Sequence, residues 1–256
     1  MSRYNPFNST IFNKVVMAIT GLILVGFIVG HALGNLQVFL GREVFNTYAH
    51  FLQSAGELLW IVRLVLIVSV ALHIITSLRL KFLNMAAKPE GYSVKGYIKS
   101  TIYSRSMIYT GLFVLLFLVY HLLHFTAHMT NPEYAGYEEG YGPKLQTTAI
   151  VETESGPKEI NAGDGLFVRH DAYKMVVVGF SQPIISIVYI LAVFFLGLHL
   201  SHAVQSMFQT LGFNGPKLTP SLIALSKVLG WGVFIMFASI PAAVLFLGLG
   251  KGVLGI

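Results

Sequence analysis

The chain has 256 residues, of which 55% are hydrophobic and 11% charged, and its mean hydropathy is +0.70. Soluble domains carry about 25% charged residues, so the composition indicates an integral membrane protein. The net charge of +6 fits membrane orientation better than nucleic-acid binding. Because the sequence contains no cysteine, it excludes disulfides, thiolate-bound zinc or iron–sulfur clusters, and c-type haem attachment on this chain.

Five apolar stretches are each long enough to cross a bilayer core, which takes about 20 helical residues. No alternating barrel pattern is present, and lipid requires backbone groups to be satisfied internally, so we expect helices. The first stretch is too long for the apolar region of a signal peptide. We therefore predict an all-α integral membrane protein of five transmembrane helices, four of them forming a bundle. The predicted spans are about 14–40, 57–82, 106–129, 182–211 and 221–249, with a folded or capping polar loop at 130–181.

A histidine lies deep inside the first span, and the same pattern recurs in the third. Both copies read M-x2-T-G-L-x8-H, ending at His31 and at His121. The first span also carries Gly26, Gly30 and Gly34 at four-residue spacing, on one helix face. This row of glycines fits close helix packing, and it equally fits open space for a flat, bulky group beside His31.

Six of the nine histidines lie deep within the predicted spans, where Asp and Glu are not found: His31, His73, His121, His124, His199 and His202. An ionisable residue in lipid is costly and points to a functional site. At 1.5 Å per residue, His31 and His121 reach matching depths toward the outer face. His73 and His199 match each other in the inner half. His124 and His202 are each about one turn away from their nearest pair.

Two imidazoles that face each other suit the iron of a six-coordinate haem better than zinc, which usually takes three or four protein ligands. Two such pairs predict a single transmembrane cytochrome b domain over residues 1–256, with two b haems stacked very roughly 15–20 Å apart. Saturated iron leaves no position for oxygen, so we expect electron transfer. The candidates for contacting haem propionates, for which interfacial anchoring is the alternative, are Arg63, Arg79, Lys81 and Arg105.

The distribution of lysine and arginine near span ends predicts the orientation. Basic residues are more frequent at the N-terminus, in the loop between the second and third spans, and in the turn between the fourth and fifth. That loop contains Lys88, Lys95 and Lys99. We expect these regions to face the cytoplasm and the polar loop to face outward.

Four short segments, one in each of the first four spans, occur in a specific order and at specific depths. They are Thr20-Gly21 with His31, Leu72-His73 followed by Arg79, Thr110-Gly111 with His121, and Leu198-His199 through Gly212. Together they resemble the dihaem cytochrome b membrane anchor of succinate dehydrogenase/fumarate reductase, the succinate:quinone oxidoreductases, in its five-helix form. The resemblance covers all five spans.

The resemblance implies an electron-transfer subunit of the respiratory chain and tricarboxylic acid cycle, in the bacterial cytoplasmic (inner) membrane with a cytoplasmic N-terminus. It implies a flavoprotein subunit with FAD and an iron–sulfur subunit docked on the cytoplasmic face, and it allows a dimer of such heterotrimers. The dicarboxylate would react at the partner's flavin. Electrons would pass between the iron–sulfur clusters, an inner haem on His73 and His199, an outer haem on His31 and His121, and a quinone, usually menaquinone.

Two details of the resemblance concern protons and quinone. Some dihaem members carry a glutamate two residues before the fourth ligand, and the residue here is Gly197, which puts a proton path at that place in doubt. A quinone site near the outer haem would be lined by the connector after the first span and by the start of the second. The candidates are His50, Gln53 and Glu57, and a polar helix start is the alternative interpretation.

Two other functions remain open. The chain could be the dihaem cytochrome b anchor of a hydrogenase or formate dehydrogenase, which would dock a nickel or molybdenum partner. It could also be a transporter that uses histidines as proton relays, which would contain no haem. A reduced-minus-oxidised spectrum and the identity of the co-purifying partner separate these three hypotheses.

Overall fold

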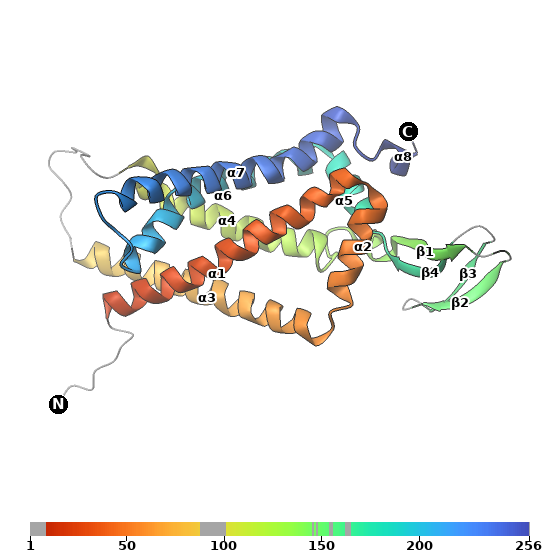
Figure 1. Ribbon diagram of the computed structural model, residues 1–256, viewed down its shortest axis with the longest axis horizontal. Coiled ribbons are helices and arrows are strands. Elements are labelled where there is room, and N and C mark those ends of the chain that lie inside the picture. The colour runs from red at the N-terminus through yellow and green to blue at the C-terminus, as the bar shows by residue number, and fades with distance from the viewer. Residues whose placement is uncertain are drawn as a thin grey trace. The chain divides into compact units, whose positions relative to one another are not determined.

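The computed structural model describes residues 9–87, 101–144, 146, 148–153, 156–161 and 165–255. Lys88, Lys95 and Lys99 of the predicted cytoplasmic loop lie outside the described residues. Figure 1 labels the α-helices and strands in chain order. The helices are α1 (Thr10–Leu36), η2 (Gln37–Leu40), α2 (Arg42–Gln53), α3 (Glu57–Ala86), α4 (Ile102–Phe125), η3 (Pro132–Gly136), α5 (Ala172–Ser181), α6 (Pro183–Thr210), α7 (Leu218–Leu247) and α8 (Lys251–Leu254).

Five of these helices are long and apolar enough to cross a membrane: Thr10–Leu40, which includes α1, and α3, α4, α6 and α7. Large apolar side chains remain exposed along them, as at Ile67 and Ile75 of α3, which are 66% and 60% exposed. A soluble surface rarely carries such a continuous apolar area, whereas lipid-facing helices require it. The prediction of an all-α membrane protein with five apolar helices is therefore confirmed.

The third span differs from its predicted bounds, because α4 begins at Ile102 and ends at Phe125. After Phe125 the N–H group of Met129 donates to the carbonyl of Leu123. His128 adopts a positive φ of 52°, a conformation that ends a right-handed helix. His128, which falls within the predicted bounds of the third span, consequently lies beyond the end of α4.

The polar loop at 130–181 is folded. Strand β1 (Glu138–Lys144) pairs antiparallel with β4 (Gly165–His170), and β2 (Ala149–Thr153) pairs antiparallel with β3 (Gly156–Ile160). Helix α5 follows, and the side chain of Asp171 caps it by accepting a hydrogen bond from the N–H group of Lys174 at 3.0 Å. An aspartate at this position satisfies a backbone donor that the first turn leaves open.

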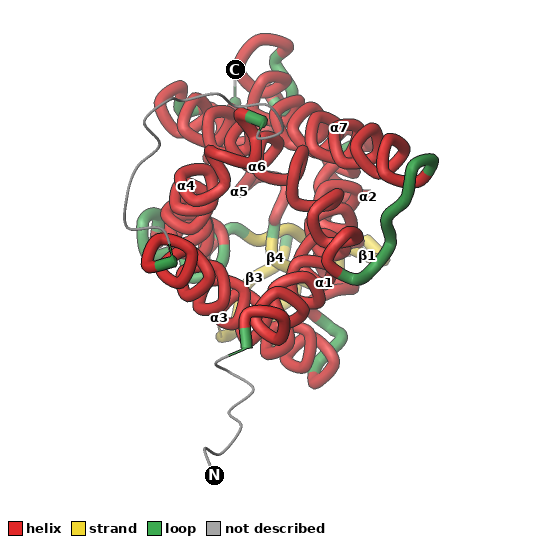
Figure 2. Tube along the Cα trace, turned by 90° about the vertical axis from the view of Figure 1, so that its left-hand side faces the viewer, coloured by secondary structure: helices red, strands yellow, loops and turns green. Residues whose placement is uncertain are grey.

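The chain divides into two compact units. Unit 1 comprises Met1–Gly34, Gly56–Leu116 and Ile190–Ala238, and unit 2 comprises Asn35–Ala55, Phe117–Tyr189 and Ser239–Ile256. That the whole chain forms one cytochrome b domain remains a prediction. Within unit 1, segments of α1, α3, α4, α6 and α7 lie alongside one another, as the end-on view of Figure 2 shows. The contact between α4 and α6 includes a stacked pair of rings, Phe113 and Phe195, with centroids 4.4 Å apart.

Helices α6 and α7 pack closely through small residues in unit 1. A Cβ atom added to Gly230 would lie 2.3 Å from Oγ of Ser201 and 2.5 Å from the carbonyl oxygen of Gly197. One added to Gly197 would lie 2.9 Å from the carbonyl oxygen of Gly230. Small residues allow this backbone approach in membrane helices. The contact gives a physical reason for glycine at position 197, because a glutamate there would collide with α7.

Unit 2 has its own buried core. It includes Val38 of η2, Tyr134 of η3, Val177 of α5 and Val244 of α7. These segments are far apart in the sequence, so the core holds the polar loop, the connector after α1 and the end of α7 together.

Candidate functional site

The inner histidine pair lies within unit 1. His73 is on α3 and His199 is on α6, and the two rings are close enough for an electrostatic interaction. Each ring lies against a glycine of the repeated motif. A Cβ atom on Gly21 would lie 3.5 Å from Cε1 of His73, and one on Gly111 would lie 3.4 Å from Cε1 of His199. The glycines therefore let each imidazole pack directly against a neighbouring helix.

A threonine hydroxyl contacts each of these two rings at the same atom. Oγ1 of Thr20 lies 3.3 Å from Nδ1 of His73, and Oγ1 of Thr110 lies 3.2 Å from Nδ1 of His199. Both threonines point their own hydrogen back along their helix. Thr20 donates to the carbonyl of Val16 at 2.8 Å and Thr110 to that of Ser106 at 3.1 Å. With its hydrogen committed, each hydroxyl oxygen is oriented to accept from the imidazole.

The methionine of each motif supplies a second contact from its backbone. The ring of His73 hydrogen-bonds to the backbone of Met17, and the ring of His199 to that of Met107. A backbone carbonyl only accepts, so the ring must donate there. The neutral imidazoles consequently carry hydrogen on Nδ1 and a lone pair on Nε2. This is the tautomer of a metal-ligating histidine whose other nitrogen is held by the protein.

These contacts change the interpretation of the M-x2-T-G-L-x8-H repeat. The sequence joins each Met, Thr and Gly to the histidine of its own copy, His31 or His121, which is a predicted outer ligand. The Met, Thr and Gly of each copy instead contact the histidine of another span, His73 or His199. The sequence already held the signal, because Thr20 and His31 are eleven residues apart, about 16 Å along a helix. A single imidazole therefore cannot both contact Thr20 and lie at the depth of His31.

Two of the three glycines beside His31 face open space. A Cβ atom on Gly26 or Gly30 would meet no atom of the described residues within 4 Å. At these two positions the observation favours open space over close helix packing. The ring of His31 stacks on Phe27, with centroids 5.3 Å apart, and approaches Phe237 at 5.7 Å.

The other proposed outer ligand, His121, lies in unit 2. Its Nδ1 is 3.4 Å from the hydroxyl of Tyr189, so a hydroxyl oxygen again contacts Nδ1. Phe117 and Phe125 flank the ring, with centroids 5.7 and 5.9 Å away. His31 belongs to unit 1, and the pairing of His31 with His121 stays a prediction from the sequence.

His124 shows a different arrangement. It is completely buried, with Nδ1 2.9 Å from the hydroxyl of Tyr189 and Nε2 3.3 Å from the hydroxyl of Tyr134. Both ring nitrogens are engaged by tyrosines, which leaves neither for a metal ion. His124 therefore has the contacts of a packing histidine.

The cationic candidates for haem propionates are spread along α3 and α4. The guanidinium of Arg63 lies 4.8 Å from the ring centroid of Trp60, a cation–π contact. Trp and Arg pairs at a helix end are typical of membrane-interface anchoring, which accounts for Arg63 without haem. Arg79 is half-buried and Lys81 exposed near the end of α3, and Arg105 is exposed in the first turn of α4.

The three quinone candidates divide between two helices. His50 is in the last turn of α2, and its Nε2 lies 3.3 Å from the hydroxyl of Tyr141. Gln53 is the exposed last residue of α2, and Glu57 is the exposed first residue of α3. His50 and Gln53 belong to unit 2 and Glu57 to unit 1, so a shared quinone site stays a prediction.

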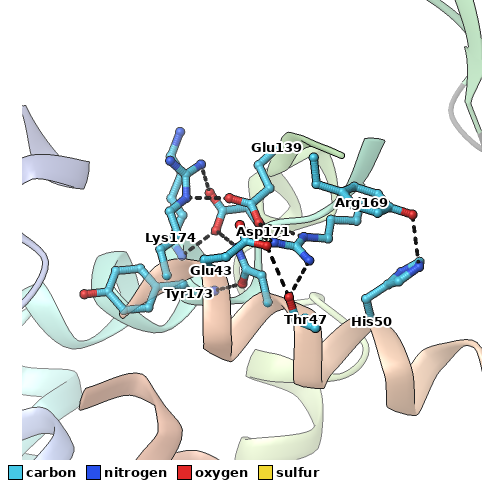
Figure 3. A network of polar contacts seen from close by, with 11 residues as sticks. Glu43, Thr47, His50, Glu139, Arg169, Asp171, Tyr173 and Lys174 are labelled. Carbon is cyan, nitrogen blue, oxygen red and sulfur yellow. Dashed lines mark hydrogen bonds and ion pairs between the residues drawn. The ribbon is translucent and has the colours of Figure 1, made fainter. Parts of the chain in front are cut away.

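Sequence reasoning missed a network of charges in unit 2 (Figure 3). Nε of Arg42 lies 2.8 Å from Glu139, and a second nitrogen of Arg42 pairs with Asp171. The buried Arg169 pairs with Glu139 at 2.7 Å and with Glu43 at 2.9 Å. The network ties α2 to β1, β4 and the start of α5. Sequence alone did not indicate it, because Arg42 and Glu43 are more than ninety residues away from their partners Glu139, Arg169 and Asp171.

The centre of this network is Asp171. Burial acts to raise the pKa of its carboxyl group, but hydrogen bonds from the Lys174 N–H group, Arg42 and Asn46 outweigh burial and lower that pKa. Asn46 donates to Asp171 at 2.8 Å and accepts from the N–H group of Tyr173 at 2.8 Å. The carboxylate is therefore held ionised as a structural anion.

Among the described residues, no group of three or more His, Asp or Glu side chains could hold a metal ion. A haem needs only two axial nitrogens from the protein, so this finding does not bear on the histidine pairs. No protein-family model, curated protein or solved structure matches the chain.

Proposed function

We propose that this chain is the dihaem cytochrome b membrane anchor of a succinate dehydrogenase/fumarate reductase complex. It would transfer electrons between the iron–sulfur subunit of that complex and a quinone, of which menaquinone is the expected type. The observation that carries the proposal is the repeated arrangement around the inner pair. Two histidines on two helices each have Nδ1 in contact with the Thr hydroxyl of an M-x2-T-G motif, and each ring also hydrogen-bonds to the backbone of that motif's Met.

The residues of the inner pair fit the requirements of a haem. Imidazole is a common axial ligand of haem iron, and the Nδ1 contacts direct the lone pair to Nε2. The rings need no third protein ligand. When bound, haem supplies reversible one-electron transfer, and the tasks of this chain are to ligate through His73 and His199 and to orient both rings through Thr20 and Thr110.

The same contacts disfavour the transporter hypothesis. A relay histidine must accept a proton at one nitrogen and pass one on from the other. At His73 and His199 the Nδ1 partners are hydroxyl groups whose own hydrogens are donated to backbone carbonyls of the same helix. A proton leaving Nδ1 would therefore have no onward partner at either threonine.

Purification of the complex from membranes tests the proposal. We expect a b-type α-band in the reduced-minus-oxidised spectrum, about two haems per chain, and a co-purifying flavoprotein that oxidises succinate. A preparation without the α-band would overturn the haem assignment. A co-purifying nickel or molybdenum subunit would leave the haem assignment in place. It would show that the complex is a hydrogenase or formate dehydrogenase and not a succinate dehydrogenase.

A further inference from the structure

His170, the last residue of β4, has an unusual hydrogen-bonding state. Its Nε2 atom is buried and has no hydrogen-bond partner among the described residues. The ring hydrogen-bonds to the backbone of Tyr137, and a carbonyl there must accept from the remaining nitrogen, Nδ1. The neutral ring consequently presents a buried lone pair on Nε2. A buried polar atom without a partner carries a desolvation cost, so this one calls for an explanation.

A second histidine lies beside it. The ring centroid of His128 is 5.7 Å from that of His170, and the ring planes differ by 24°. His128 is half-buried, so solvent reaches the pair. It is also the one described non-glycine residue with a positive φ, 52°. Such a backbone conformation is uncommon for residues with a side chain and is enriched at ligand sites.

The separation of the rings matches a shared ligand. With a metal–nitrogen bond of about 2.0–2.1 Å, each imidazole centroid lies about 3.2 Å from the metal, and two tetrahedral ligands have centroids about 5 Å apart. Opening the angle at the metal by a small amount gives the observed spacing. We propose that His128 and His170 bind one divalent transition-metal ion of the class that prefers imidazole, such as Zn²⁺, Cu²⁺ or Ni²⁺.

The surroundings supply a further oxygen donor. Glu138 is directly opposite His170 in the β1–β4 ladder, and directly opposite residues of an antiparallel pair share one face. Its charge acts on His170. No group of three donors is in place among the described residues, so the site has two protein ligands, with water completing the coordination and Glu138 in a position to approach a bound cation.

One contrast separates this pair from ordinary packing histidines. His124, in the same unit, has both ring nitrogens engaged by tyrosine hydroxyls, whereas Nε2 of His170 has no hydrogen-bond partner among the described residues. A neutral ring with an available lone pair is the form that ligates a metal.

Metal titration of the intact purified protein, carried on a tag without histidine and first treated with a chelator, tests the proposal. Calorimetry with Zn²⁺ is expected to show one site per chain that His128→Ala and His170→Ala each weaken at least tenfold. Cu²⁺ bound at this site should give an electron paramagnetic resonance spectrum with coupling to two imidazole nitrogens. His50→Ala, which removes a half-buried histidine of α2 elsewhere in unit 2, is the matched control and should leave the affinity unchanged.

A second variant separates a loss of metal binding from a loss of folding. In His170→Asn the side-chain amide can still donate to the Tyr137 carbonyl, but the Nε2 lone pair is gone, so metal binding should be lost while the thermal unfolding midpoint is kept. Glu138→Gln should weaken binding several-fold. Unchanged Zn²⁺ affinity in both His128→Ala and His170→Asn would overturn the proposal, and so would a wild-type protein that binds no Zn²⁺.

Discussion

The histidines inside the apolar helices of the two units are held in different ways. In unit 1, His73 and His199 lie against glycines, contact a threonine hydroxyl through Nδ1, and hydrogen-bond to a methionine backbone. In unit 2, His124 is enclosed by aromatic rings and uses both nitrogens to contact tyrosines. Each arrangement satisfies an imidazole in an apolar setting, but only the first directs a lone pair away from the protein's own hydrogen bonds. Burial of a histidine in a span is thus a weak sign of ligation, and the partner of each nitrogen is a stronger one.

The largest expected difference is in haem content, between variants that lack a histidine of unit 1 and a variant that lacks His124 of unit 2. His73→Ala or His199→Ala should each lower the haem content from about two to about one per chain, because six-coordinate haem needs both axial nitrogens. His124→Phe should leave the content at about two, since both of its nitrogens are used in packing. Haem extraction as the pyridine complex measures this. Loss of haem in His124→Phe, with none in His199→Ala, would reverse the assignment.

The next largest expected effect is a loss of stability when the small-residue packing between α6 and α7 is disturbed. Gly230→Ala should destabilise the solubilised protein by about 1–3 kcal/mol, since the added methyl group would overlap Ser201 and the backbone at Gly197. Gly232→Ala is the control on the same helix, because its Cβ meets no described atom within 4 Å. That substitution should be neutral or mildly stabilising. Thermal unfolding followed by circular dichroism compares the two, and equal midpoints would contradict the close contact.

Substitution of the two threonines tests whether the Nδ1 contacts affect the inner haem as well as the fold. Thr20→Val and Thr110→Val keep the shape but remove the hydroxyl oxygen that accepts from Nδ1. Outer-shell partners of this kind typically change metal affinity by about 10–100-fold. We expect looser retention of the inner haem and a shift in its midpoint potential, with Thr→Ser restoring both. Redox titration of the inner haem is the measurement, and an unchanged potential in both valine variants would remove the positioning role.

The charge network of unit 2 predicts a smaller, pH-dependent effect. The folded pKa of Asp171 lies below its ordinary value of 3.8, so ionised Asp171 contributes stability that is fully present above pH 3.8. That contribution is lost as the pH falls from 3.8 through the lowered folded value. Asp171→Asn should abolish this part of the pH dependence of unfolding while leaving the haem spectrum unchanged. If wild type and variant lost stability in parallel between pH 5 and pH 2, the anion would not be a source of stability.

The five spans followed from the sequence because their apolar length is a local property. The depths of the histidines, counted in residues along each span, stay a prediction. What could not be predicted is rotation about each helix axis, which decides that Thr20 contacts His73 and that Gly26 meets nothing within 4 Å. The Arg42–Asp171 pair and the His128–His170 pair depend on how the polar loop folds. That loop has no periodicity to indicate which of its residues meet.

The haem content of the intact purified protein is the most direct test of a dihaem cytochrome b. We expect about two b haems per chain in the wild type, about one in His199→Ala, and about two in His124→Phe. A wild-type protein that contains no haem when isolated from haem-replete cells would contradict it, and the hydroxyl contacts at His73 and His199 would then need another explanation.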